Sequence, residues 1–292
     1  MIRSLAFTLI LAAGLGGTYG GSLQPSQSQA SDSTAVLLAA GDIASCTNGA
    51  PATARLLDDQ PGQIMVAGDA AYRTSRDPNP YVTCYDSTWG RHKNRTRATL
   101  GNHDFEPRHL RQYFDYFGDA AGPRPGGYYS FELGSWHVIA LNSNLDTGPR
   151  SLQGKWLAAD LAAHPAKCTI AVMHHPRFSS GPHAAYWTTR PAFRLLDSAG
   201  VDIVLSGHDH IYERFAPMTW EGKPSDTGVR QFVVGTGGSG LYTIGRPEPN
   251  SEAHTDGDFG ILKLTLKPDG YSWEFLPVRT DSFTDSGSGS CH

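Results

Sequence analysis

Short apolar runs that alternate with helical patterns constrain the fold of this chain more than any other feature of its sequence. Four of these runs have the length and composition of strands buried on both faces, and they lie at 35–40 (AVLLAA), 63–68 (QIMVAG), 168–174 (CTIAVMH) and 201–207 (VDIVLSG). Helical patterns lie between them at 51–59, 151–164 and 190–200. Two hairpin patterns, 127–133 with 136–142 and 259–266 with 271–278, add strands that no helix separates. We therefore expect an α/β fold in which two β-sheets pack face to face with helices outside.

The N-terminus has the pattern of an export signal. Arg3 precedes an apolar stretch from Leu5 to Leu15, and a polar segment follows at once. About ten apolar residues match the core of a signal peptide and are too few for a membrane span, which needs about 20. We expect residues 1–30 to be a signal peptide and leader, cleaved after Ala30 or nearer Gly20. The protein would then be secreted or periplasmic, without a stable membrane anchor.

Length and charge set the domain organisation and exclude one class of partner. Residues 31–280 are roughly 250 residues, enough for one large domain. The Ser/Gly-rich segment 281–292 is expected to be a mobile tail. A formal net charge of −4 argues against a polybasic nucleic-acid-binding protein, and we expect no nucleic-acid partner. The oligomeric state does not follow from the sequence.

Side chains of the kinds that bind metals stand at the ends of five apolar runs, which are the four given above and TRATL at 96–100. In an α/β sheet the loops at the carboxyl ends of parallel strands lie together, so these side chains are expected to meet. A glycine stands directly before Asp42, Asp69 and His208, at Gly41, Gly68 and Gly207, where it permits a sharp turn. The side chains are Asp42; Asp69 and Tyr72; Asn102, His103 and Asp104; His174 and His175; and His208 and His210.

This set of carboxylates, phenol, amide and imidazoles predicts a centre with two metal ions. It holds more donors than one ion needs, and a shared carboxylate lets two cations lie about 3.5–4 Å apart. Oxygen donors with imidazoles suit iron, manganese or zinc. Each motif alone has a simpler explanation, such as a turn or the end of a strand, and their ordered joint occurrence is what favours the metal centre.

Four cysteines in an exported chain predict disulfides. Cys46 and Cys84 follow strand-end loops that are expected to converge, so they are the preferred pair. Cys168 and Cys291 would remain as the second pair. A zinc ribbon is not favoured, because the sequence contains no Cys-x-x-Cys motif.

The ordered motifs GD, GDAAY, GNHD, HHP and GHDHIYER resemble those of the calcineurin-like metallophosphoesterases, and within them the purple acid phosphatase branch. The resemblance spans Ala35 to Gly240, including the GTGG sequence at 235–238. It implies a four-layer α-β-β-α sandwich with two mixed β-sheets and a dinuclear metal centre at the strand ends.

Carried over to this chain, the resemblance implies two overlapping ligand sets. The first metal would be bound by Asp42, Asp69, Tyr72 and His210. The second would share Asp69 and add Asn102, His174 and His208, with His175 as the alternative to His174. A phenolate from Tyr72 would favour Fe(III) at the first site, and the neutral Asn102 would leave the second divalent, as Fe, Zn or Mn.

Three further residues are candidates for catalysis. His103 is expected to be the general acid for the leaving group, held in one tautomer by Asp104. His183 is expected to contact phosphate near the mouth of the site. The alternatives are packing behind the ligands for His103, a helix cap for Asp104 and an ordinary loop position for His183. We expect supporting roles for Tyr212, Glu213 and Arg214, the last paired with a carboxylate behind the ligands.

Together these features predict an exported dinuclear-metal phosphoester hydrolase that acts on small-molecule phosphomonoesters through a metal-bound hydroxide. A phosphodiesterase or phospholipase-like hydrolase with the same centre is the alternative, because fold does not fix the ester. A non-catalytic metal-binding surface protein is a more remote one. Ala171 and Asp104 depart from the residues usual in the purple acid phosphatase branch, which weakens any inference about the substrate.

Overall fold

The computed structural model describes residues 34–46, 49–73, 78–183 and 186–292, which belong to one compact unit. The expected signal peptide and leader, residues 1–30, lie outside the described residues. None of the helices described is both long and apolar enough to cross a membrane.

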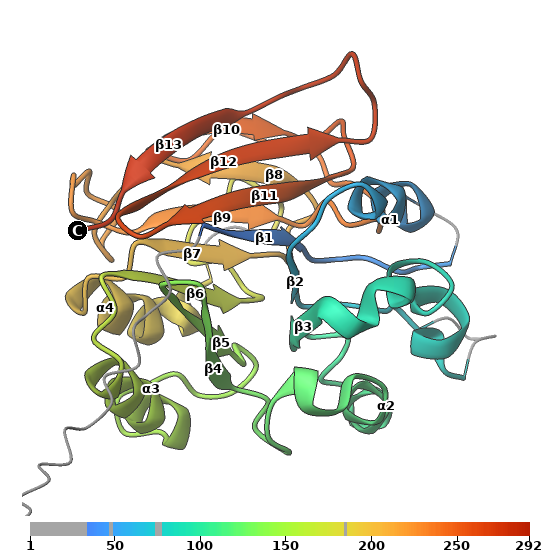
Figure 1. The fold of residues 1–292 in the computed structure, drawn as a ribbon, viewed down its shortest axis with the longest axis horizontal. Coiled ribbons are helices and arrows are strands. Elements are labelled where there is room, and N and C mark those ends of the chain that lie inside the picture. The colour runs from blue at the N-terminus through green and yellow to red at the C-terminus, as the bar shows by residue number, and fades with distance from the viewer. Residues whose placement is uncertain (1–33, 47–48, 74–77, 184–185) are drawn as a thin grey trace, which may run out of the picture. The chain divides into compact units, whose positions relative to one another are not determined.

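The first of two β-sheets has six strands in the order β13-β12-β11-β1-β2-β3 (Figure 1). Strands β1, β2 and β3 are parallel, whereas β11, β12 and β13 add antiparallel neighbours, so the sheet is mixed. The strands are β1 (Ala35–Ala40), β2 (Gln63–Ala67), β3 (Thr96–Thr99), β11 (Gly260–Lys267), β12 (Gly270–Pro277) and β13 (Ser286–Ser290).

The second sheet has seven strands in the order β10-β8-β9-β7-β6-β5-β4 and is also mixed. Its parallel centre is β5, β6, β7 and β9, with antiparallel strands at both edges. Every residue of β5, β6 and β7 is buried, which explains their continuous rather than alternating apolar sequences. The strands are β4 (Tyr129–Leu133), β5 (Trp136–Leu141), β6 (Cys168–Met173), β7 (Ile203–Ser206), β8 (Tyr212–Phe215), β9 (Arg230–Val234) and β10 (Ser251–Thr255).

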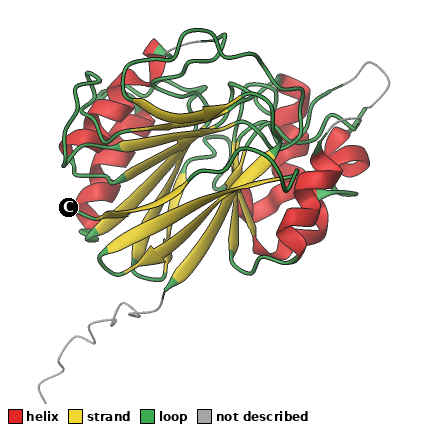
Figure 2. Cartoon of the chain, turned by 90° about the horizontal axis from the view of Figure 1, so that it is seen from above, coloured by secondary structure: helices red, strands yellow, loops and turns green. Residues whose placement is uncertain are grey.

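Helices lie on the outer faces of the two sheets (Figure 2). On the seven-stranded sheet, Leu157 of α3 and Phe193 and Leu196 of α4 pack against Ile139 and Val204. Helices α1 and α2 pack beside the six-stranded sheet and join the large core cluster that also contains residues of both sheets. The expected α-β-β-α sandwich is therefore confirmed. The helices are α1 (Ala50–Asp58), α2 (Pro107–Phe117), α3 (Leu152–Ala163) and α4 (Arg190–Ser198), with short helices η1 (Tyr81–Tyr85), η2 (Trp89–Arg95), η3 (Gly118–Ala121) and η4 (Trp187–Thr189).

The C-terminal segment 281–292 is not the mobile tail that its composition suggested. Its strand β13 pairs antiparallel with β12 along Ser286–Ser290. Gly287 lies against the Trp273 ring and Gly289 against the Tyr271 ring, where a side chain would collide with the aromatic carbons. The glycines therefore permit close packing of this strand rather than disorder.

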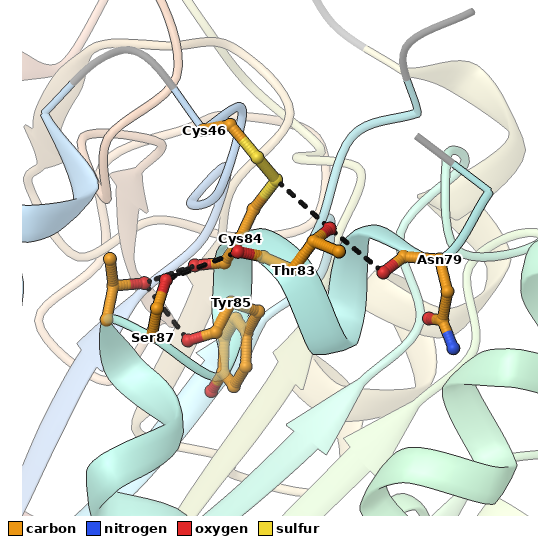
Figure 3. Close-up of a disulfide and its surroundings, with 7 residues drawn as sticks. Cys46, Asn79, Thr83, Cys84, Tyr85 and Ser87 are labelled. Atoms are coloured by element: carbon orange, nitrogen blue, oxygen red, sulfur yellow. Dashed lines mark hydrogen bonds between the residues drawn. A yellow bond between two sulfur atoms is a disulfide. The ribbon is translucent and has the colours of Figure 1, made fainter. Parts of the chain in front are cut away.

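Two disulfides join the four cysteines in the pairs the sequence favoured. Cys46, after β1, is bonded to Cys84 in η1, and Figure 3 shows this bond beside Thr83. Cys291, at the C-terminus, is bonded to Cys168 at the start of β6. The two bonds tie together segments that are 38 and 123 residues apart, respectively.

Candidate metal centre and active site

The loops that leave β1, β2, β3, β6 and β7 meet at the carboxyl ends of these strands. Three of the residues there, Asp42, Asp69 and His208, have positive φ angles of 60°, 50° and 72°. Such a conformation is uncommon for residues other than glycine and costs of order 1–3 kcal/mol where it is sparsely populated. Three of the expected ligands thus hold backbone conformations that only the surrounding structure can maintain.

One group of side chains forms around Asp42. The Tyr72 hydroxyl donates to Asp42 Oδ1 at 2.7 Å and lies 3.1 Å from His210 Nε2. His210 Nε2 in turn lies 3.3 Å from Asp42 Oδ1. The other ring nitrogen, Nδ1, is 2.6 Å from the carbonyl oxygen of Gly240, which fixes the orientation of the ring. These three side chains are the expected ligands that belong to the first metal alone.

A second group forms around Asn102. Its Oδ1 lies 3.1 Å from His174 Nε2 and 3.0 Å from His208 Nδ1. His174 Nδ1 is 2.9 Å from the carbonyl oxygen of Ala67, so Nε2 faces the group. The His208 backbone N–H donates to Asp42 Oδ2 at 2.7 Å and thereby links the second group to the first.

Asp69 lies between the two groups. Its Oδ2 is 3.4 Å from His174 Nε2, and a donor atom from each of Asp42, Asp69 and His174 falls within 4.8 Å of the others. Its Oδ1 accepts the backbone N–H of His103 at 2.9 Å. The structure thus brings all seven expected metal ligands into one cluster, with Asp69 in the position of a shared carboxylate. Their coordination of metal stays a prediction.

The glycines of the motifs are explained by this crowding. A Cβ on Gly68, which has φ +83°, would overlap the His174 ring, and one on Gly101 would overlap the Asp69 carboxylate. The sequences GD and GNHD therefore need glycine at these two positions so that the backbone can approach the side chains of the cluster.

The donor set fits two cations. His174 and His210 each direct one ring nitrogen into the cluster and place the other on a backbone carbonyl, as histidines that bind metals do. The oxygen donors are two carboxylates, an amide and a phenol, which suit hard or borderline ions. Asp42 and Asp69 are buried without a lysine or arginine as ion-pair partner among the described residues. Buried carboxylates in this position favour a bound cation.

The electrostatics of the cluster bear on the role of Tyr72. Burial raises the pKa of Tyr72 well above its ordinary value, and the negative charges of Asp42 and Asp69 raise it further. A phenolate at this position therefore requires a strongly charged cation beside it. Burial opposes protonation of His174, but the Asp69 charge outweighs it and raises the pKa of His174 to about 10.

His175, the alternative to His174, also comes near the cluster, with one ring nitrogen within 4.8 Å of ligand atoms of His174 and His208. Its Nδ1 lies 2.8 Å from the Ser143 hydroxyl, and its ring stacks on Tyr186 at 4.3 Å. Burial and the neighbouring charge of His174 lower the pKa of His175 to about 3. Of the two histidines, His174 is therefore the one whose Nε2 meets Asn102 and Asp69.

His103 lies at the exposed side of the cluster. Its ring is 4.7 Å from the Tyr72 ring, between centroids, and its side chain is 41% exposed. Nδ1 lies 3.7 Å from Glu106 Oε1. The imidazole is therefore partly exposed beside the first ligand group, and its role as general acid stays a prediction.

Asp104 does not hold the His103 ring as expected. Its Oδ2 accepts the backbone N–H groups of Gly101 and Ala70, and its Oδ1 accepts the Tyr81 hydroxyl at 2.7 Å. Both oxygens are thus used by other groups because the carboxylate points into the protein. The helix-cap alternative is also wrong, since Glu106 occupies the N-cap position of α2. Asp104 instead joins the loops that carry Asp69 and Asn102.

His183 lies over the second group, and its partner is a residue that sequence reasoning missed. Its ring centroid is 4.4 Å from that of His208. Its Nδ1 and its backbone N–H both face Asp209 Oδ1, at 2.9 and 3.1 Å. Asp209 is fully buried, and its position between the two histidines of the GHDH motif was the available signal. Tyr242, which stacks on His210 at 4.0 Å, had no such signal.

The residues after the GHDH motif support the site from behind. Arg214 pairs with Asp285, Nε to Oδ2 at 2.7 Å, and with Glu252. The Tyr212 hydroxyl also donates to Asp285, and Glu213 accepts the backbone N–H of Ser180. The expected pairing of Arg214 with a carboxylate is therefore confirmed, and one partner comes from the C-terminal segment.

Two mixed sheets with carboxylates and imidazoles gathered at their strand ends define the metallophosphoesterase architecture. Residues 35–212 match the family model of the calcineurin-like phosphoesterases, and the chain belongs to that family. It is similar to purple acid phosphatase 21 of Arabidopsis thaliana, with 35% identity over 175 residues, which are 55% of this chain and 39% of that protein. The chain spans about half the length of the plant relatives it matches.

Solved structures show the same fold. A purple acid phosphatase from yellow lupin (Lupinus luteus) seeds superposes with a TM-score of 0.77 at 19% identity, over 89% of this chain and 54% of that one. GAP50, described as the anchor in the inner membrane complex of Plasmodium, superposes with a TM-score of 0.67 at 16% identity, over 89% of each chain.

Proposed function

We propose that this chain is an exported, metal-dependent phosphomonoesterase with a dinuclear centre. The observation that carries the proposal is the meeting of two buried carboxylates, a phenol, an amide and three imidazoles at the strand ends. Membership of the calcineurin-like phosphoesterase family supports it.

The ligand assignment follows the two groups of side chains. Asp42, Tyr72 and His210 would hold the first cation, Asn102, His174 and His208 the second, and Asp69 both. Two such cations supply a nucleophile from water near neutral pH and neutralise charge on the phosphoryl oxygens. We propose Fe(III) at the first position, because Tyr72 as a phenolate would be a hard anionic donor, and divalent Fe, Zn or Mn at the second.

Two of the remaining residues would act on the ester itself. His103 would donate a proton to the leaving oxygen, since its ring is partly exposed beside the first ligand group. His183 would donate to a phosphoryl oxygen, and the buried Asp209 holds its ring in place. Asp104 acts at a distance, by fixing the loops that carry Asp69 and Asn102.

Export is proposed from two features. Residues 1–30 have the pattern of a signal peptide, and the two disulfides suit an oxidising compartment. Expression with the native N-terminus, followed by mass spectrometry of the secreted protein, tests this. A protein that stays in the cytoplasm with its leader intact contradicts it.

Activity on matched esters tests the proposed reaction. We expect hydrolysis of p-nitrophenyl phosphate with kcat/KM at least tenfold higher than for bis-p-nitrophenyl phosphate, and two metal ions per chain by elemental analysis. The reverse preference identifies a diesterase. A protein with two ions and no hydrolysis of either ester would be a metal-binding surface protein instead.

Absorption spectroscopy tests the metal at the first position. Ferric iron bound by Tyr72 should give a visible charge-transfer band that Tyr72→Phe removes. Tyr81→Phe is the matched control, because Tyr81 is buried against Asp104 rather than among the ligands. A colourless, active wild-type enzyme excludes ferric iron at that position.

A further inference from the structure

Two cavities continue from the metal centre along the outer side of α4. The first, of about 540 Å³, is lined by the ligand Asn102 and by His175, Tyr186 and Pro191. The second, of about 520 Å³, shares Pro191 and is lined by Arg190, among others. Either volume lies within the range of small-molecule sites, about 300–1,000 Å³. A phosphoester held at the metals therefore has space for its leaving group on this side.

Arg190 and Arg194 line the outer cavity, and Arg177 shares the Trp187 ring with Arg190; we call these three residues the arginine cluster. None of them has an ion-pair partner within 4 Å among the described residues. The nearby carboxylate of Glu221 pairs instead with Lys223, at 2.7 Å. Lys223 and, more weakly, Arg190 and Arg194 lower the pKa of Glu221, so the cluster has one carboxylate nearby, which it shares with Lys223.

Arg177 is the unusual member of the cluster. It is 4% exposed, and its Nε has no hydrogen-bond partner among the described residues. Burial lowers the pKa of the Arg177 guanidinium, and the charge of Arg190 lowers it further. The Phe178 ring, whose centroid is 4.3 Å from the Arg177 guanidinium carbon, stabilises this buried cation, so Arg190 and Arg194 are the members of the cluster that are free to meet an anion.

Helix α4 adds to the positive potential. Arg190 and Arg194 stand four residues apart on it, where like charges repel, and Arg190 begins the helix, where the end carries partial positive charge. Tryptophan rings hold the guanidinium groups in place. Trp220 lies 4.6 and 5.1 Å from the two guanidinium carbons, and the 66% exposed Trp187 lies 4.8 Å from that of Arg177.

We propose that the arginine cluster is a leaving-group subsite that selects phosphoesters whose leaving group carries a second anionic group. The inference rests on the proposed function, because it assumes that the first phosphoryl group is held at the metals. Asp146 is the acidic residue that lines the inner cavity, and its Oδ1 is occupied by the backbone N–H of Gly148. The second anion would therefore lie in the outer cavity, beside Arg190 and Arg194, rather than next to the metals.

Matched aryl phosphates test the subsite. Phenyl phosphate is compared with 4-(phosphonomethyl)phenyl phosphate, and biphenyl phosphate with its 4′-phosphonate, because the phosphonate is an anion that the enzyme cannot hydrolyse. The measured quantity is the ratio of kcat/KM with the phosphonate to kcat/KM without it. We expect this ratio to fall about tenfold in each single variant, Arg190→Gln and Arg194→Gln, relative to wild type. The fall should appear with the phenyl pair, the biphenyl pair or both, as for a lost charge-assisted hydrogen bond.

The controls separate this inference from the proposed function. Both arginines are exposed, so their variants should fold. Lys267→Gln removes one positive charge, as the arginine variants do. Lys267 lies at the end of β11, beside the start of β1 and away from the expected ligands, so this variant should leave the ratio unchanged. If both arginine variants hydrolyse phenyl phosphate and keep the wild-type ratio of kcat/KM values, the subsite is wrong but the proposed function stands. Absence of hydrolysis of every ester, with metal bound, overturns the proposed function.

Discussion

Among the described residues, two clusters in which several imidazoles meet aspartate carboxylates differ in what their polar atoms face. One is the candidate metal centre. The other lies between β4, β5 and α3, where His137 directs Nδ1 to Glu132 at 2.7 Å and Nε2 to Asp160 at 2.8 Å. His164 stacks on His137 at 4.6 Å and places its Nδ1 2.9 Å from the Asp160 carbonyl oxygen.

In the second cluster the protein itself supplies the partners. Ser130 donates to Asp160 Oδ1, and both ring nitrogens of His137 face carboxylates. The side chains of His137 and Asp160 therefore have no buried polar atom without a partner. In the metal centre, by contrast, imidazole nitrogens converge on the same amide and carboxylate oxygens, and His208 Nε2 has no partner among the described residues. The comparison teaches that composition alone does not identify a metal site. The candidate metal centre differs from the second cluster because its donor atoms converge on one point at the strand ends, and because three of its residues have positive φ angles.

Removing the shared carboxylate should separate the two clusters most strongly. Asp69→Ala is expected to lose at least one metal ion and about 10³-fold in kcat, because a metal supplies several kcal/mol of transition-state stabilisation. Asp160→Ala should keep both ions and most of the activity. Elemental analysis and p-nitrophenyl phosphate kinetics measure this, and unchanged metal content in Asp69→Ala would rule out the assignment.

His103 provides the next largest difference. His103→Gln should lower kcat on an alkyl phosphate by about 10²-fold, because general acids contribute 10²–10⁴-fold. The loss should be smaller on p-nitrophenyl phosphate, whose leaving group needs less protonation. His164→Gln, in the other cluster, is the matched control and should alter neither rate. Equal losses on both esters would indicate that His103 acts on binding or structure.

The second cluster should matter for stability instead. Asp160→Ala leaves His137 Nε2 and the Ser130 hydroxyl without their acceptor in a buried place, so the free energy of unfolding should fall by about 2–3 kcal/mol. Urea denaturation of the two proteins measures the difference. A loss of metal in this variant would show that the two clusters are not independent.

Asp285 is a carboxylate outside both clusters that accepts its hydrogen bonds from protein groups, as Asp160 does. Burial opposes its ionisation, but hydrogen bonds from Arg214 and Tyr212 hold the pKa of Asp285 below its ordinary value. Because the folded pKa lies below the unfolded one, this stabilisation is present above about pH 4 and is lost as the pH falls further. Asp285→Asn should therefore lower the free energy of unfolding by about 1.5 kcal/mol at pH 7.

The pH dependence gives the check on that explanation. The difference between wild type and Asp285→Asn should narrow when denaturation is measured below pH 4, where the wild-type carboxylate becomes protonated. A difference that stays constant from pH 7 to pH 3 would mean that shape, and not charge, determines the role of Asp285.

The elements and ligands that the sequence identified share one property, which is local patterning. Apolar runs such as 168–174 predict buried strands, and a parallel strand must carry its last residues to the sheet edge, so the position of His174 follows from the pattern alone. Asp104 could not be placed correctly, because adjacency in sequence does not reveal which way a side chain points. Strand β13 was missed because its partner rings, Tyr271 and Trp273, come from a different part of the chain.

The bond between Cys291 and Cys168 ties segment 281–292 to a strand that leads into the candidate site. Cys168 begins β6, and the residue after that strand's last position is His174, so the C-terminus is covalently attached to the strand that presents a ligand. The same segment supplies Asp285, which pairs with Arg214, and Arg214 stands four residues after His210. Reducing the Cys168–Cys291 bond would free the segment that carries Asp285, and with it one support of each of two histidine-bearing segments.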